Sequence, residues 1–418
     1  MARSLNAHQI PKGWQYELLD KLAERCSGHT PSKSFPEYWN GGIKWISLAD
    51  SHRLDKGYVY ETDKEISTEG IKNSSANVHP VGTVVISRDA GIGKSGVMAE
   101  PMAVSQHFIA WKCDNEQKMN NWYLYNWLQF NKYEFERQAV GSTIKTIGLP
   151  FFKKLKIAAP PYLEQQKIAN ILSTWDKAIS TTERLIENST QQKKSLMQQL
   201  LTGKKRLFND EGKRFEGEWE EIKLGSLYSF KRGKGISKGQ LTENGNKCVL
   251  YGELYTHYGE VIHEVKSRTR EINSVKSIKG DVLIPASTTT TGIDLANATA
   301  VLEDDILLGG DINILRPKKA TDAIFMAHLL THIKKFEIAR KGQGITIIHV
   351  YGKDLANLDV LTPKDLKEQQ KIAIVLTNAD KEIELLEQQL ANFQQEKKAL
   401  MQVLLTGKKR VVVDGEVI

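Results

Sequence analysis

The chain contains 418 residues, of which 40% are hydrophobic and 26% are charged. This length is sufficient for about two to four globular domains, and the composition excludes a collagen-like, disordered or disulfide-stapled protein. The net charge of +8 favours a polyanionic partner. Because no apolar run reaches the roughly 18 residues of a membrane span, and the N-terminal residues lack the apolar segment of a secretory signal, we expect a cytoplasmic protein with no membrane partner.

The sequence of residues 1–160 predicts an α/β domain that is rich in strands. Short β-rich runs such as TVVISR and HFIAW alternate with clusters of Gly, Asn, Ser and Thr, and a helical patch begins at Met119. Residues 161–206 predict one long helix, which begins after a proline and ends at the sequence TGKKR. The same order then recurs as a second strand-rich domain, a second long helix and a C-terminal tail, over residues 207–363, 364–410 and 411–418.

The two predicted helices carry a strong internal repeat. Residues 164–206 align without a gap with residues 368–410, and 25 of these 43 positions are identical. A weaker repeat links the preceding domains, for example between GSTIKTI from Gly141 and GQGITII from Gly342. Two related halves whose strand-rich domains differ indicate that the protein performs the same task twice, on different targets.

Each predicted helix has apolar residues at an average spacing of about 3.5, the pattern of a coiled-coil seam. We predict that the two helices pair antiparallel, the alternative being two independent surface helices on separate domains. Gly203 and Gly407 are predicted to end the helices in the left-handed conformation. The seam residues are Ile168, Leu172, Trp175, Ile179, Ile186, Leu196 and Leu200 in the first helix, and Ile372, Leu376, Ile383, Leu386, Leu390, Phe393, Leu400 and Leu404 in the second.

The sequence contains no recognisable catalytic or metal-binding motif. It lacks the glycine-rich cofactor loop and the Asn/Asp-Pro-Pro-aromatic motif that methyl transfer to a DNA base requires. GIGKSG from Gly91 is not a phosphate-binding P-loop, because Arg88 stands where that motif needs its first glycine. No zinc spacing of Cys and His occurs, and Cys26, Cys113 and Cys248 are too far apart for a disulfide framework. We therefore expect a non-enzyme without catalytic residues, a metal site or a cofactor of its own.

The repeated order of segments resembles the specificity (S) subunit of a Type I DNA restriction–modification enzyme. The resemblance covers essentially the whole chain and implies two β-rich target recognition domains, separated by two long antiparallel coiled-coil helices in an internal pseudo-two-fold repeat. It is carried by W-x(4)-L-x(2)-L at Trp14 and Trp219, GTVVISRDAGIGKSG from Gly82, GSTIKTI from Gly141, PPYLEQQKIANIL from Pro160, YGELYT from Tyr251 and the two LLTGKKR endings.

The resemblance also implies a function and a set of partners. Each target recognition domain is expected to read one half of a bipartite double-stranded DNA site. The helices are expected to set the spacer and to bind two modification (methyltransferase) subunits, and two restriction (motor-nuclease) subunits complete the complex. This assembly directs DNA methylation and restriction. S-adenosylmethionine, ATP and Mg²⁺ are implied for those partner subunits and not for this chain.

DNA-binding side chains are expected on loops and strand ends, where they can reach base edges and phosphates. For each one, a solvated or locally hydrogen-bonded side chain is the alternative. Since IPASTTTTG replaces ISRDAGIGKSG in the second domain, Arg88 and Lys94 have no counterparts there. The candidates in the first domain are Lys44, Ser47, Ser87, Arg88, Lys94, Gln106, His107, Ser142, Thr143 and Lys145. The candidates in the second domain are Lys231, Arg232, Lys234, Tyr251, Tyr255, Ser287, Thr288, Thr289, Thr290, Asn313, Gln343 and Thr346.

Two other functions stay open at the level of the sequence. One is a self-contained restriction enzyme with an unrecognised catalytic site, which DNA-stimulated methylation or cleavage by the isolated chain would support. The other is a coiled-coil adaptor that joins two protein-binding domains. A lack of sequence-specific DNA binding, even with modification subunits present, would support the adaptor.

Overall fold

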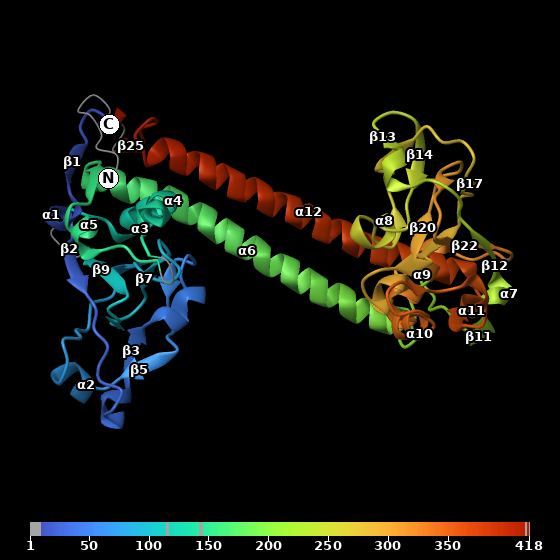
Figure 1. Cartoon of the computed structure of the whole chain (residues 1–418), viewed down its shortest axis with the longest axis horizontal. Coiled ribbons are helices and arrows are strands. Elements are labelled where there is room, and N and C mark those ends of the chain that lie inside the picture. The colour runs from blue at the N-terminus through green and yellow to red at the C-terminus, as the bar shows by residue number, and fades with distance from the viewer. Residues whose placement is uncertain (1–9, 114–116, 142–144, 414–415, 418) are drawn as a thin grey trace. The chain divides into compact units, whose positions relative to one another are not determined.

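The computed structural model contains helices and strands throughout its described length (Figure 1). Among the described residues, no helix is both long and apolar enough to cross a membrane. The described residues are 10–113, 117–141, 145–413 and 416–417.

The chain divides into two compact units, each of which contains one strand-rich domain. Unit 1 consists of residues 1–183 and 388–418, and unit 2 of residues 184–387. Two long helices, α6 (Tyr162–Leu200) and α12 (Leu366–Leu404), each contribute one part to each unit. In Figure 1, α6 is coloured green and α12 red.

The domain of unit 1 contains a five-stranded main sheet and several smaller sheets. Its strands are β1 (Gln15–Leu18), β2 (Glu24–Ser27), β3 (Trp39–Ile46), β4 (Tyr58–Val59), β5 (Lys64–Ile66), β6 (Val84–Ser87), β7 (Ser95–Met98), β8 (Ala103–Val104), β9 (Phe108–Lys112), β10 (Lys156–Ala159), β25 (Val412–Val413) and β26 (Glu416–Val417). Its short helices are α1 (Leu19–Leu22), α2 (Thr68–Lys72), α3 (Asn121–Phe130), α4 (Lys132–Gln138) and α5 (Leu149–Lys153), with 3₁₀ turns at Pro36–Tyr38 and Leu48–His52. The sheets have the strand orders β2-β9-β6-β7-β4, β5-β3-β8, β1-β10 and β25-β26.

The domain of unit 2 has a related architecture. Its strands are β11 (Trp219–Lys223), β12 (Tyr228–Arg232), β13 (Leu241–Thr242), β14 (Asn246–Val249), β15 (Val261–Ile262), β16 (Ser267–Thr269), β17 (Val275–Lys276), β18 (Val282–Pro285), β19 (Ser287–Thr288), β20 (Thr299–Val301), β21 (Leu307–Leu308), β22 (Ile312–Pro317), β23 (Ile348–His349) and β24 (Asp359–Pro363). Its short helices are α7 (Leu224–Leu227), α8 (Glu253–Thr256), α9 (Ala323–His328), α10 (Lys335–Arg340) and α11 (Gly352–Ala356), with a π-helix at Leu329–Ile333 and 3₁₀ turns at Lys238–Gln240 and Gly292–Ala296. The sheets have the orders β12-β22-β18-β20-β15, β13-β16-β14-β21-β17, β11-β24 and β19-β23.

The internal repeat extends through both domains. The order β2-β9-β6-β7-β4 in unit 1 corresponds strand by strand to β12-β22-β18-β20-β15 in unit 2. The directions agree as well, because the first three neighbouring pairs of each sheet are antiparallel and the last pair is parallel. The mixed α/β fold class with its duplicated domains, which the sequence predicted, is therefore confirmed.

The central strand of each sheet is buried on both faces. In β6, Val84 and Ile86 pack into the core that also holds residues of α6 and α12, whereas Val85 between them faces a separate core. In β18, Val282 and Leu283 divide between two cores in the same manner. Because side chains alternate across a strand, these continuous apolar runs are required to bury both faces.

Within each unit, α6 and α12 run antiparallel. In unit 1 the rings of Trp175 and Phe393 lie 5.6 Å apart, and Nζ of Lys397 lies 2.5 Å from the carboxylate of Asp176. In unit 2, Lys193 forms an ion pair with Asp380. The seam residues named above are all buried or half-buried, in contrast to most of their exposed helix neighbours. Burial of one face along each helix is the arrangement that a coiled-coil seam requires.

Each long helix ends where the sequence predicted a left-handed cap. Gly203 has φ of +70° and Gly407 has φ of +66°, conformations that favour glycine, so this prediction is confirmed. A side chain at Gly203 would lie 3.1 Å from the ring of Trp219, and one at Gly407 would lie 2.3 Å from Pro11. The glycines therefore also permit the start of each domain to pack against a helix end.

A buried ion pair follows each of these glycines. In unit 1, Arg410 donates two hydrogen bonds to the carboxylate of Glu164, at 2.7 and 2.6 Å. In unit 2, Arg206 contacts Glu368 in the same bidentate manner, with one bond of 2.7 Å. Both glutamate side chains are at most 1% exposed. The first acid of each repeat thus pairs with the last arginine of the other repeat.

We expect Arg206→Ala or Arg410→Ala to destabilise its unit by roughly 3–5 kcal/mol, because each leaves a buried carboxylate without its partner. Chemical denaturation followed by circular dichroism measures this effect. Lys213→Ala is the control, since Lys213 and Glu211 are both exposed and such a pair contributes only about 0–1 kcal/mol. Equal stability of the arginine and lysine variants would contradict the assigned role of the buried pairs.

Candidate nucleic-acid interface

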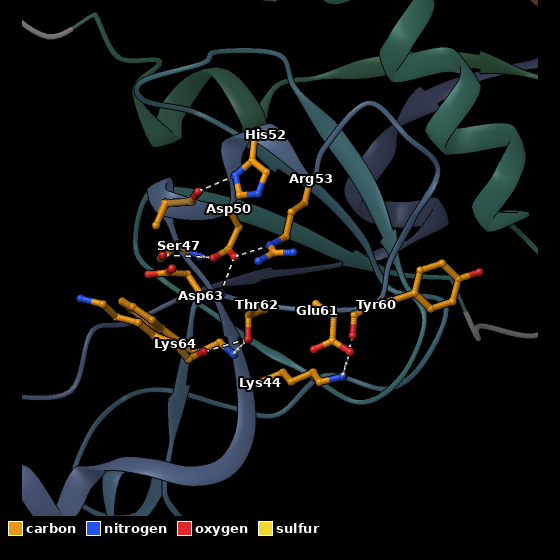
Figure 2. Close-up of polar contacts among 12 residues, drawn as sticks. Lys44, Ser47, Asp50, His52, Arg53, Tyr60, Glu61, Thr62, Asp63 and Lys64 are labelled. Carbon is orange, nitrogen blue, oxygen red and sulfur yellow. Dashed lines mark hydrogen bonds and ion pairs between the residues drawn. The ribbon is translucent and has the colours of Figure 1, made fainter. Parts of the chain in front are cut away.

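Asp50 organises a loop at the surface of unit 1 (Figure 2). Its carboxylate accepts hydrogen bonds from the backbone N–H groups of Ser47 at 2.9 Å and Asp63 at 2.7 Å. The Ser47 hydroxyl donates to the same carboxylate at 3.1 Å, and Nε of Arg53 lies 3.3 Å from it. Because the Asp50 side chain is fully buried, these contacts fix the loop in one conformation.

A cleft of about 280 Å³ lies beside this loop and gathers three predicted residues. Ser47, Gln106 and His107 line it together with Lys33 and Lys64. Hydroxyl, amide and imidazole groups can contact base edges, and lysine ammonium groups bind phosphates. This cleft is therefore a candidate site for DNA contact in unit 1.

Asp89 connects this cleft to the segment that contains the predicted residue Lys145. Its carboxylate forms a hydrogen bond with Nδ1 of His107 and accepts another from the hydroxyl of Thr146. Gln106 also has an intramolecular partner, because its side-chain oxygen accepts a hydrogen bond from Thr30. These polar groups are held in place by the protein before any ligand binds.

The predicted residue Lys44 has acidic partners within unit 1. Its ammonium group donates to the backbone oxygen of Tyr60 at 2.6 Å and forms ion pairs with Glu61 and Glu100 (Figure 2 shows Tyr60 and Glu61). The hydrogen bond with Glu100 raises the pKa of Lys44 above its usual value. Two carboxylates thus compete with any phosphate for this cation.

Arg88 holds the end of β6 against Ile147. The backbone oxygen of Arg88 accepts a hydrogen bond from the N–H of Ile147 at 2.8 Å, and Nε of Arg88 donates to the Ile147 oxygen at 3.0 Å. Next to Ile147, Val140 and Thr146 pair as an antiparallel bridge. The neighbouring Ser87 is buried, and its hydroxyl donates to the oxygen of Ala90. The Arg88 side chain is 19% exposed, so it lies at the protein surface while bonded to Ile147.

A second cleft of unit 1 has a volume of about 520 Å³ and is lined by three lysines. Lys94 and Lys145, both predicted residues, line it with Lys132. Lys94 donates to the backbone oxygen of Ser51 at 3.0 Å and Lys132 contacts Asp55 at 2.7 Å, whereas Lys145 is exposed. The predicted residues Ser142 and Thr143 lie outside the described residues.

Unit 2 contains the counterpart of the bridge between Val140 and Thr146. Gln343 and His349 form the equivalent antiparallel bridge, and the N–H of Val350 donates to the oxygen of Ala286 at 3.0 Å. We call the described residues 140–141 and 145–146 of unit 1, and residues 343–349 of unit 2, the bridged loops. Gly344 has φ of +125° and Gly141 has φ of +130°. The structural counterpart of Gly141 is therefore Gly344, which corrects the sequence alignment with Gly342 by two residues.

The second bridged loop lies beside the predicted serine and threonine run. Strands β19 and β23 pair Ser287 with His349 and Thr288 with Ile348. Ser287 and Thr288 are buried, whereas Thr289 and Thr290 are exposed. Asn313 is also buried and donates its side-chain N–H to the oxygen of Val350 at 3.1 Å. The structure thus brings this run and Asn313 together with the loop that carries the exposed residues Gln343 and Thr346.

The other predicted residues of unit 2 lie on further surface segments. Lys231, Arg232 and Lys234 are exposed on β12 and the segment after it, and Arg232 pairs with Asp311. Tyr251 lines a cleft of about 830 Å³. Its ring lies 6.4 Å from that of Tyr255, whose pKa is raised by burial and by Tyr251, while a hydrogen bond with Thr288 opposes this shift.

Sequence reasoning missed several residues of these surfaces. Asp50 stands in the pattern Ser-x-x-Asp, a capping-box signature that could have identified it. Lys33 and Lys64 have no local signal, because only the fold brings them to the cleft with Gln106. Ile345 is fully exposed in the second bridged loop, and apolar side chains of this kind contact thymine methyl groups.

Comparison with known proteins gives the family of the chain. Residues 11–189 and 216–395 each match the Type I restriction modification DNA specificity domain, so the chain belongs to this family. The specificity subunit of the Type I restriction enzyme MjaVIII from Methanocaldococcus jannaschii is 24% identical over 98% of this chain and 96% of its own length. The putative MjaX specificity subunit of the same organism is 26% identical over 96% of this chain and 95% of its own length.

Solved structures share the fold. The crystal structure of the Type I restriction–modification S subunit from Mycoplasma genitalium has a TM-score of 0.60 at 17% identity, covering 96% of this chain and 97% of that one. A chain from a structural study of assembly and conformational transition in the type I R-M system has a TM-score of 0.54 at 15% identity, covering 95% and 98%. Family membership confirms the predicted class, a DNA specificity subunit and not a catalytic one.

Proposed function

We propose that this chain is the DNA-recognition subunit of a Type I restriction–modification complex. Its recognition domains, residues 1–160 and 207–363, each read one half of a bipartite double-stranded DNA site. The observation that carries this proposal is the duplication of one domain fold with a bridged loop at the same place in each copy. The side chains at equivalent loop positions differ, for example Lys145 and Ile348, as expected for domains that read different bases.

The proposed reading surface combines the bridged loops with the residues beside them. In unit 1 these are the two clefts that contain Gln106, His107 and Lys145, joined through Asp89 and Arg88. In unit 2 they are the threonine run, Asn313 and the second bridged loop. Intramolecular hydrogen bonds hold the side chains of Gln106, His107 and Asn313 in place, which lowers the entropy lost when DNA binds.

We also propose that α6 and α12 hold the two domains apart and bind two modification subunits, with two restriction subunits completing the complex. Exposed apolar residues on these helices within unit 2, Leu185, Ile374 and Leu385, offer a contact surface away from the seam. In this arrangement, S-adenosylmethionine, ATP and Mg²⁺ act in the partner subunits. DNA selected from a random pool by the chain with its modification subunits should contain two short sequences at a fixed separation. Selection without any enriched sequence would argue for the adaptor function.

Arg88→Ala is expected to relax base choice at one position of the half-site read by unit 1. A bidentate arginine–guanine contact contributes roughly 1–3 kcal/mol of discrimination, or about 5- to 150-fold between correct and incorrect bases. The substitution also removes the hydrogen bond from Nε of Arg88 to Ile147. Binding to matched and single-mismatch duplexes, with modification subunits present, measures this effect.

The same assay at two salt concentrations separates the alternatives for Arg88. A phosphate contact alone would weaken binding to all sequences equally and reduce the salt slope by about one. An unchanged affinity for every duplex would remove Arg88 from the interface and leave it a structural residue of the loop. Lys213→Ala, at an exposed residue of the connector (residues 207–216), is the matched control and should change neither base choice nor salt slope.

A further inference from the structure

Unit 2 contains a cluster of three potential metal ligands away from the proposed reading surface. Glu260, His328 and His332 each offer one ligand atom, and these atoms all lie within 4.8 Å of one another. Nε2 of His332 lies 2.6 Å from the carboxylate of Glu260. The rings of His328 and His332 stack at a centroid distance of 5.9 Å.

Helix geometry places the two histidines on one face. His328 is the last residue of α9, and His332 lies four residues later within the π-helix Leu329–Ile333. Residues four apart share a helix face, and π-helical segments are frequent at functional sites. Glu260 comes from a distant segment, immediately before the edge strand β15, and its backbone oxygen accepts a hydrogen bond from Ala300 at 2.8 Å.

His328 is the unusual member of the cluster. It has no solvent exposure, and neither of its ring nitrogens has a hydrogen-bond partner. Buried polar groups are nearly always hydrogen-bonded, because an unpaired group retains its full desolvation cost. A ligand bound between His328 and the other two side chains would satisfy one of these nitrogens.

The three side chains are of types that bind metal ions. Imidazole nitrogens and carboxylate oxygens are common ligands of divalent transition metals. Glu260 and His332 lie within hydrogen-bond distance of each other, and the buried His328 lies beside them with both ring nitrogens unpartnered.

We propose that Glu260, His328 and His332 form a binding site for a divalent transition-metal ion of the Zn²⁺ type. Two imidazoles and one carboxylate are a known zinc ligand set, with water in the fourth position. Ligand atoms around a tetrahedral Zn²⁺ lie roughly 3.4 Å apart, so the cluster needs side-chain movements of only about 1 Å. Mg²⁺ prefers all-oxygen ligands and fits this set poorly.

The bound ion would fasten the π-helix to the edge of the main sheet of unit 2. Strand β15 has only two residues and pairs with β20 on one side. The residues around β15, including Glu260, therefore need contacts other than strand pairing to hold them in place. The bound ion would therefore stabilise the packing of the π-helix against the edge of this sheet.

Metal binding to the purified full-length chain tests this proposal. After treatment with a chelator and its removal, ZnCl₂ and CoCl₂ are titrated separately and MgCl₂ serves as the comparison salt. We expect one equivalent of Zn²⁺ to bind, a higher midpoint of thermal unfolding, and a visible Co²⁺ absorption typical of imidazole ligands in a low-coordinate site. Glu260→Gln and His332→Gln should weaken Zn²⁺ binding by about tenfold or more.

His79 in unit 1 provides the matched control. It is also buried with both ring nitrogens unpartnered, but it belongs to no such ligand cluster among the described residues. His79→Gln should bind Zn²⁺ as the unmodified chain does. Because His328→Gln can disturb folding, the two partly exposed ligands, Glu260 and His332, decide the result. Equal Zn²⁺ affinity in their variants and in the unmodified chain, or no Zn²⁺ binding at all, would overturn the proposal.

Discussion

Replacement of residues 14–155 by the corresponding segment of another specificity subunit is expected to change one half of the methylated sequence completely. The other half and the spacing should stay as they are. The physical reason is that the sheets and the first bridged loop of this domain are formed within unit 1, with their own buried cores. Sequencing of methylated sites in cells that express the chimera with the modification subunits measures the result.

The equivalent segment of unit 2, residues 219–360, gives the reciprocal control. Its replacement should change the opposite half-site and leave the first one intact. A change of both half-sites in either chimera would show that the domains do not read DNA independently. Chimeras should retain Gly203 and Gly407, because the start of each domain packs against these helix ends.

Lengthening both long helices at the same level is expected to lengthen the spacer without altering either half-site. Duplication of residues 180–183 in α6 and 384–387 in α12 adds four residues to each helix where the units divide. Four residues add about 6 Å, close to the rise of about two base pairs of DNA. Since the helices are antiparallel, equal insertions preserve the pairs Asp176–Lys397 and Lys193–Asp380.

A four-residue insertion in the connector tests the specificity of this effect. Residues 209–212 form an exposed turn, so an insertion there should leave the spacer unchanged. Thermal unfolding identifies variants that are folded. The parental spacing in a folded variant with both helices lengthened would rule out the helices as the element that sets the spacer.

The long helices and their caps could be predicted from local sequence alone. The spacing of apolar residues such as Ile168 and Leu172 indicates a helix and its buried face, and glycine after LLT indicates where it ends. The buried pairs Arg410–Glu164 and Arg206–Glu368 could not be predicted. Arginine and glutamate occur on every helix surface, and only the antiparallel arrangement within each unit brings these particular residues together.

The reading surface was only partly accessible to sequence reasoning. Ser287 and Thr288 were predicted as DNA contacts on loops or strand ends, but nothing local showed that they form strand β19 and are buried beside β23. In the second bridged loop, identical glycines at 342 and 344 made the alignment ambiguous, and the backbone conformation resolved it. The ion pair between Lys44 and Glu100 could not be predicted, because the two residues are distant in the sequence.

The candidate metal site shows the same dependence on distant contacts. His328 and His332 are four residues apart, but two histidines at this spacing are common on helices and carry no signal alone. Glu260 precedes His328 by 68 residues and joins the two histidines only because β15 pairs with β20. Sequence motifs for metal binding detect ligands that are close in the chain, so this cluster escaped the search that found no zinc spacing.

Single-molecule sequencing of methylated bases in a genome that expresses this chain with its modification subunits tests the central proposal most directly. We predict one methylated motif with two defined half-sites and a constant number of unread base pairs between them, which disappears when the chain is removed. A methylated sequence that is continuous, or one that persists without this chain, would contradict the assignment of one half-site to each recognition domain.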